Sequence, residues 1–176
     1  AKHLLPDLTV NHRLTSPVFV IGQARSGTSI LVALVRKYLK INFGPESQFF
    51  LRLLRDLPRY GSLDSDTNFR ALVKDIANER CFELNQFGFT VNVEEVVGNA
   101  DRSYAGAIDY IFRDFAAHNG MVRWGDKTPS YIENLFALDE LFPDAQYIHI
   151  VRDGRDVALS NFEVFFGANN AVVAAL

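Results

Sequence analysis

A short glycine-containing segment with the sequence GQARSGTS, which begins at Gly22, has the composition of an anion-binding loop. Gly22 and Gly27 have the spacing of the Walker A loop, in which backbone N–H groups and a helix N-terminus hold a phosphate. There a lysine follows the second glycine, whereas here Thr28 and Ser29 follow it and Arg25 lies inside the loop. A guanidinium, hydroxyls and backbone amides can bind an anion without a metal. The alternative is an ordinary strand-to-helix turn capped by Thr28 and Ser29.

Two other polar segments have positions that would bring them to the same site. They are GDKTP, residues 125–129, and RDGR, residues 152–155. Apolar, β-branched runs predict a strand at 18–21 before the glycine loop, a strand at 121–124 before GDKTP, and a buried strand within AQYIHIVRD, residues 145–153. Ligands of open α/β sheets bind at the carboxyl ends of the strands. The three polar segments are therefore expected to lie together.

Helices are predicted between these strands. The clearest begins after Ser103, keeps one apolar face and ends near Gly120. The others are a helix at 28–39 with apolar Ile30, Leu31, Leu34, Val35 and Tyr38, one ending near Pro58, one capped by Asp66 or Thr67, one capped by Ser130 and stopped by Pro143, and one within DGRDVALSNFEVFF. Residues 42–48 are predicted as a polar break, and residues 85–102 have no clear pattern. Alternating strands and helices predict an α/β fold with a central parallel sheet and helices on both faces.

Composition limits the class of protein. The 176 residues are 48% hydrophobic with a formal net charge of −3, which fits one globular domain and argues against non-specific nucleic-acid binding. The single cysteine, Cys81, permits neither an intramolecular disulfide nor a CxxC zinc site, so we expect a reducing, cytoplasmic compartment. No apolar run is long enough to span a membrane, and residues 1–16 do not have the pattern of a signal peptide.

Two motifs carry a resemblance to a known family. VIGQARSGTSIL resembles the 5′-phosphosulfate loop of sulfotransferases that use 3′-phosphoadenosine 5′-phosphosulfate (PAPS), especially the R-S-G-T-T form of tyrosylprotein and many bacterial members. IHIVRDGRDVALS resembles their second signature, in which an arginine ending a strand and a serine eight residues later bind the 3′-phosphate. With WGDKTP between them, the resemblance spans residues 17–167. It implies a three-layer α/β/α fold related to that of P-loop nucleotide kinases, with no metal.

The resemblance also implies residue roles. The 5′-phosphosulfate would be bound by Arg25, Ser26, Gly27, Thr28 and Ser29. The 3′-phosphate would be bound by Arg152 and Ser160. The alternative for Arg152 is a surface ion pair, and Arg155 is either a second phosphate contact or a partner of Asp153 or Asp156.

The chemistry of transfer needs a cation and a base. By the resemblance, Lys127 would contact the bridging oxygen, with Asp126 orienting it or another loop group. Cytosolic members place a histidine where Pro129 stands here, and proline cannot accept a proton. Tyrosylprotein sulfotransferases use a glutamate after the first helix, and INFGPES puts Glu46 at the matching distance. The alternative is that Glu46 caps a helix starting near Ser47.

Two aromatic side chains near these motifs are assigned to the core instead. His149 is expected to be a buried core histidine rather than a base. Trp124 could pack against adenine, but core burial is the safer expectation.

The expected activity is transfer of a sulfuryl group from PAPS to a hydroxyl or amine of a small-molecule or peptide acceptor, releasing 3′-phosphoadenosine 5′-phosphate (PAP). The alternatives are a kinase or ATPase with a degenerate loop, and a non-catalytic nucleotide-binding module. Family members continue into a basic glycine-containing loop over the adenine, whereas this sequence ends at ANNAVVAAL. Residues 1–176 are therefore expected to form one domain that is incomplete at its C-terminus. The acceptor and the oligomeric state stay open.

Overall fold

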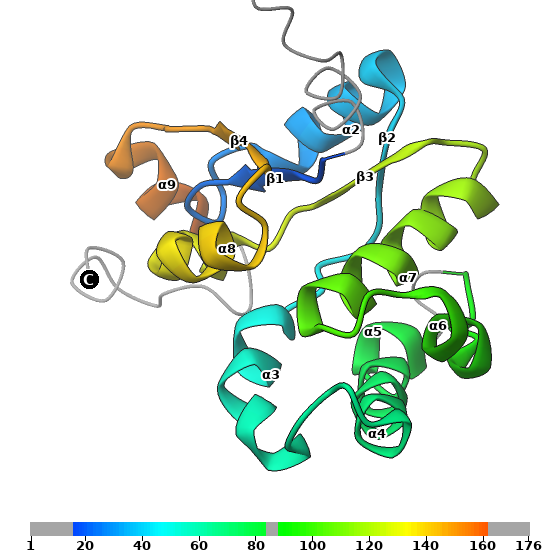
Figure 1. The fold of residues 1–176 in the computed structure, drawn as a ribbon. Coiled ribbons are helices and arrows are strands. Elements are labelled where there is room, and N and C mark those ends of the chain that lie inside the picture. The colour runs from blue at the N-terminus through cyan, green and yellow to red at the C-terminus, as the bar shows by residue number, and fades with distance from the viewer. Residues whose placement is uncertain (1–15, 84–87, 162–176) are drawn as a thin grey trace, which may run out of the picture.

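The computed structural model describes residues 16–83 and 88–161 of the chain. Within these residues, four strands form one sheet: β1 (Val18–Ile21), β2 (Ile41–Phe43), β3 (Arg123–Asp126) and β4 (Gln146–His149). Their order is β2-β3-β1-β4, and every neighbouring pair is parallel (Figure 1). Parallel neighbours require crossover connections, which helices provide here. The predicted α/β class is confirmed.

The two faces of β1 point into different apolar clusters, because side chains of a strand alternate between faces. Val18 and Val20 pack with Ile41, Phe43 and Val35 of helix α2 (Thr28–Leu39). Phe19 and Ile21 belong to a larger cluster that includes side chains of α7 (Tyr104–His118) and α8 (Leu135–Leu141). Helices therefore cover both faces of the sheet, and the predicted three-layer arrangement is confirmed.

The remaining helical elements complete the framework. They are α3 (Phe50–Asp56), η1 (Leu57–Tyr60), α4 (Asp66–Ala77), α5 (Arg80–Glu83), α6 (Val93–Asn99), η2 (Pro129–Asn134) and α9 (Gly154–Asn161). Ser65, rather than Asp66 or Thr67, takes the N-cap position of α4. The part of the predicted last helix beyond residue 161 lies outside the described residues. None of the helices described is long and apolar enough to cross a bilayer.

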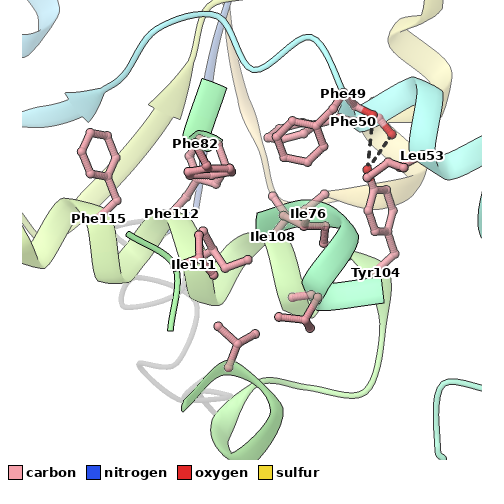
Figure 2. Close-up of a cluster of buried hydrophobic side chains, with 14 of the residues drawn as sticks. Phe49, Phe50, Leu53, Ile76, Phe82, Tyr104, Ile108, Ile111, Phe112 and Phe115 are labelled. Carbon is pink, nitrogen blue, oxygen red and sulfur yellow. Dashed lines mark hydrogen bonds between the residues drawn. The ribbon is translucent and has the colours of Figure 1, made fainter. Parts of the chain in front are cut away.

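Helix α7 is the best-predicted element. Ser103 caps it by accepting a hydrogen bond of 2.9 Å from the N–H of Gly106, and Gly120, with φ of 69°, follows its end. Its apolar face is buried and packs on the aromatic residues of α3 and α5, as Figure 2 shows. The rings of Phe50 and Phe112 meet edge to face with centroids 5.4 Å apart. This cluster anchors the start of α3 below the sheet.

Strands β2 and β3 differ from the prediction. Residues 41–43 form an edge strand where part of a polar break was expected, and the polar Asn42 is buried within it. Strand β3 begins and ends two residues later than predicted and includes Gly125. A Cβ at Gly125 would lie 2.5 Å from the Phe43 ring and 2.6 Å from the Val18 carbonyl oxygen. Close strand contacts therefore require glycine at a position that sequence patterns assign to a turn.

Three predicted burial patterns are also wrong. In α2, Ile30, Leu34 and Tyr38 are exposed and Val35 is buried. The helix expected from Ser130 is divided into η2, with Pro129 in its first turn, and α8, where Phe136 is 90% exposed. Strand β4 is at the sheet edge and only partly buried, and His149 is exposed rather than in the core. The partial burial of β4 and the exposure of His149 follow from the edge position, because β4 pairs only with β1 within the described residues.

Candidate active site

The three polar segments meet at the carboxyl ends of the strands, as expected. The loop after β1 lines two hollows, of about 530 Å³ and about 310 Å³. Arg25, Thr28 and Ser29 line both. The larger hollow is also lined by Gln23, Ala24, Glu46, Gln48, Lys127, Pro129, Ser130, Ile132 and Glu133, and the smaller one by Gly27, Ile30, Arg152 and Ser160. One loop thus separates two hollows, each lined by at least one cationic side chain, that a ligand with two anionic ends could occupy together.

The backbone of the glycine loop has left-handed conformations at Arg25 and Gly27, with φ of 69° and 96°. Gly22 has φ of 151°, and a Cβ there would lie 2.6 Å from the carbonyl oxygen of Ile150 after β4. Gly27 is the N-cap of α2, and no side chain forms a capping hydrogen bond there. The capping role that the alternative gave to Thr28 and Ser29 is therefore not seen, because the N-cap residue is Gly27. Thr28 is instead buried against the loop.

The two sequence motifs contact each other. Arg25 Nε donates to Ser160 Oγ of α9 at 3.1 Å, and Arg152 Nη1 donates to the carbonyl oxygen of Arg25 at 3.1 Å. Arg152 also has a longer ion pair of 3.8 Å with Asp156. These contacts bring together the residues predicted to bind the two anionic groups of one ligand.

Arg155 does not join this group. Its guanidinium pairs with Asp153 at 2.6 Å, its side chain is 89% exposed, and this pairing lowers the pKa of Asp153. Of the two roles open to Arg155, the structure supports the ion pair.

Glu46 and Lys127 face each other in the larger hollow. Lys127 Nζ contacts Glu46 Oε1 at 2.5 Å, and Gln48 Nε2 donates to Glu46 Oε2 at 3.2 Å. Helix α3 begins at Phe50, four residues later, so Glu46 does not cap it as the alternative supposed. The side chains of Lys127 and Glu46 are 14% and 33% exposed. This partial burial strengthens their attraction relative to that of a fully exposed pair.

Asp126 was expected to orient either Lys127 or another group of the loop. In the structure it bonds to the loop that carries Glu46, through Ser47. The carboxylate is 2% exposed, and its Oδ1 accepts from the N–H of Ser47 at 3.3 Å. Burial raises the pKa of Asp126 to about 6, against a smaller lowering effect of the hydrogen bonds that it accepts. Tyr131, which the sequence interpretation did not select, contacts the same loop through its hydroxyl. No local pattern marks such a tyrosine, because its partners lie about 80 residues earlier.

Trp124 is a core residue, as was expected from the sequence in preference to a contact with adenine. It is fully buried, and its Nε1 donates to Asp109 Oδ1 of α7 at 2.9 Å. Within the described residues, no group of three or more His, Cys, Asp or Glu side chains has an arrangement that could hold a metal ion.

Comparison with known proteins agrees with this geometry. Residues 17–175 match the model of the Sulfotransferase family, so the chain belongs to that family. A protein-tyrosine sulfotransferase A from Caenorhabditis elegans is 29% identical over 142 residues, which are 80% of this chain and 32% of that protein. The chain thus spans about a third of the length of this curated relative. The family match confirms the predicted family.

Proposed function

We propose that the protein transfers a sulfuryl group from PAPS to a hydroxyl or amine by in-line displacement. The observation that carries the proposal is the contact between the two motifs, in which Arg25 bonds to Ser160 and Arg152 to Arg25. A ligand with a 5′-phosphosulfate and a 3′-phosphate matches two cation-lined hollows that meet at one loop. Adenosine 5′-phosphate lacks the 3′-phosphate and would leave Arg152 without its anion.

The chain's residues fit this ligand by chemical type. The backbone and hydroxyls of Ser26, Gly27, Thr28 and Ser29, with Arg25, would hold the phosphosulfate at the N-terminus of α2. Arg152 and Ser160 would hold the 3′-phosphate. PAPS supplies an activated sulfuryl group whose leaving group is a phosphate oxygen. No metal ligand is needed, because the arginines, Lys127 and backbone amides supply the positive charge.

Glu46 acts as the base in this proposal, and Lys127 is the cation at the leaving oxygen. In the transfer, a bond forms between the acceptor oxygen or nitrogen and sulfur, the bond from sulfur to the phosphate oxygen breaks, and Glu46 accepts the acceptor's proton. Lys127 stabilises the negative charge that grows on the leaving oxygen, so PAP departs without protonation. The ion pair between Glu46 and Lys127 holds both groups beside the glycine loop until an anionic ligand offers the lysine a second partner.

Calorimetric titration with PAP, adenosine 5′-phosphate and ATP with magnesium tests the proposal. We expect PAP to bind most tightly. Preference for ATP would instead support the kinase or ATPase alternative. Transfer from PAPS should then be assayed with hydroxyl and amine acceptors, beginning with tyrosine peptides because a relative is named for protein tyrosine. PAP binding without transfer to any acceptor would favour the non-catalytic module.

A further inference from the structure

Glu46 and Lys127 are 81 positions apart, and neither lies within a helix. Glu46 belongs to residues 46–50, here called the Glu46 segment, which lead from β2 into α3. Lys127 belongs to residues 126–131, here called the Lys127 segment, which lead from β3 into η2. The alignment of the two side chains therefore depends on what holds these two segments together.

Three backbone N–H groups of the Glu46 segment donate to three side chains of the Lys127 segment. The N–H of Ser47 donates to Asp126 Oδ1 at 3.3 Å, that of Gln48 to Thr128 Oγ1 at 3.4 Å, and that of Phe50 to Tyr131 Oη at 3.0 Å. The hydroxyls of Ser47 and Tyr131 share a fourth hydrogen bond of 2.7 Å. The Glu46 segment is thus held to the Lys127 segment along its whole length.

The bonds of Ser47 and Phe50 are buried, and that of Gln48 is partly buried. Ser47, Asp126, Thr128 and Tyr131 are all buried. A buried polar group that loses its partner cannot replace it with solvent, so each bond constrains the segment more strongly than a surface bond would. Four hydrogen bonds in this way join the two loops into one unit.

The backbone of Gln48 supports the same conclusion. Its φ is 60°, a left-handed conformation that side-chain-bearing residues rarely adopt and that surrounding contacts must maintain. In this conformation the N–H of Gln48 reaches Thr128 while its side chain turns back to Glu46 Oε2. Strain at Gln48 is therefore linked to the orientation of the carboxylate.

We propose that Asp126, Thr128 and Tyr131 are positioning residues, which hold the Glu46 segment so that the Glu46 carboxylate faces Lys127 during sulfuryl transfer. The inference rests on the proposed function, in which Glu46 is the base. Their side chains do not line the hollows assigned to PAPS, so they act on the catalytic pair and not on PAPS binding.

Tyr104 provides a matched control. It is a buried tyrosine whose hydroxyl donates to the carbonyl oxygen of Phe50 at 2.9 Å, so it bonds to the same residue as Tyr131 but from α7 (Figure 2). It has no bond to Ser47 or Gln48 among the described contacts. Tyr104→Phe and Tyr131→Phe each remove one buried hydroxyl, and only the second removes bonds that join the Glu46 segment to the Lys127 segment.

The first test measures amide hydrogen exchange at Ser47, Gln48 and Phe50 by NMR in the free protein. Tyr131→Phe should accelerate exchange at Phe50 on the order of tenfold relative to the wild type, because its N–H loses a buried acceptor. Exchange at Ser47 should also accelerate, because its hydroxyl loses the bond to Tyr131 Oη that helps to hold the segment. Tyr104→Phe should leave Ser47 and Gln48 within about twofold. Equal exchange in both variants would overturn the proposal, whether or not the protein transfers a sulfuryl group.

The second test compares kcat with the Kd for PAP. Tyr131→Phe should lower kcat on the order of tenfold while the Kd for PAP stays within about twofold, because misplacing a base costs rate and not PAPS-site contacts. Asp126→Ala should lower kcat similarly, and Asp126→Asn, which keeps an acceptor oxygen for Ser47, should restore most of it. A kcat in Tyr131→Phe no lower than in Tyr104→Phe would overturn the proposal. A wild type that neither binds PAP nor transfers sulfuryl would refute the proposed function, and the exchange rates would still decide whether the two segments are held as described.

Discussion

Arg25 and Ser160 are 135 positions apart in the chain, yet Arg25 Nε donates to Ser160 Oγ at 3.1 Å. This bond joins the glycine loop after β1 to the helix after β4, two segments that follow neighbouring strands. Because Arg152 bonds to the carbonyl oxygen of Arg25, the residues assigned to both anionic groups of PAPS form one connected cluster. A substitution at the proposed 3′-phosphate site can be distinguished from one at the proposed 5′-phosphosulfate site by comparing the binding of PAP with that of adenosine 5′-phosphate, which lacks the 3′-phosphate.

Arg152→Ala should weaken PAP binding by about 1.5–3 kcal/mol, the usual loss for a hydrogen bond to a charged group. Binding of adenosine 5′-phosphate should change much less, because that ligand has no 3′-phosphate. Calorimetry with the two ligands measures the difference. Arg155→Ala is the matched control, since that arginine is paired with Asp153 and should leave both affinities unchanged. An equal loss for both ligands would remove Arg152 from the 3′-phosphate site.

Glu46→Gln should lower kcat by roughly 10²–10⁴-fold, the typical contribution of a general base. PAP affinity should change little, because Glu46 is not assigned to PAP and glutamine has a similar size. Steady-state kinetics with PAPS and an active acceptor provide the measurement. Glu133→Gln is the control, because that carboxylate lines the same hollow without contacting Lys127 among the described contacts. Unchanged turnover in Glu46→Gln would exclude it as the base.

Gly22→Ala should destabilise the protein and reduce PAP binding. A Cβ at this position would lie 2.6 Å from the carbonyl oxygen of Ile150, which requires the loop or the end of β4 to shift. The loss in free energy of unfolding should be on the order of 1–3 kcal/mol, measured by urea denaturation. Gly98→Ala, within α6 where a Cβ has open space, should instead stabilise by roughly 0.5–1 kcal/mol. An equal change in the free energy of unfolding for Gly22→Ala and Gly98→Ala would mean that glycine is not sterically required at position 22.

Asp126 should make stability depend on pH. Burial raises its pKa to about 6 from an ordinary value of 3.8, so the folded state binds this proton more tightly than the unfolded state does. The stabilising contribution of Asp126 is then fully present below about pH 4 and is lost as the pH rises through about 6. Asp126→Asn cannot ionise and should gain on the order of 2–3 kcal/mol relative to the wild type between pH 4 and pH 7.

Urea denaturation at several pH values measures this difference. A pH-independent difference between Asp126→Asn and the wild type would mean that the Asp126 carboxyl titrates in the folded protein as it does in the unfolded chain.

Local patterns in the sequence were sufficient for the elements whose signals are local. The β-branched run at 18–21, the apolar periodicity and the Ser103 cap of α7, and the spacing of Gly22 and Gly27 each predict a structure that the chain adopts. Strand β2 was missed because three residues with a polar centre, Asn42, carry too little periodicity. The exposure of His149 and of the outer face of α2 could not be predicted either, since periodicity gives a face but not what covers it.

The sequence by itself determined the family, through two motifs whose residue types and spacing suit anionic groups. Only the tertiary structure decided which of these residues meet. The ion pair of Glu46 with Lys127 and the bonds of Ser47 and Phe50 to Asp126 and Tyr131 join segments about 80 residues apart. The physical reason is that such contacts depend on strand order and crossover geometry, which bring distant loops to one edge of the sheet and leave no periodic signal in either loop.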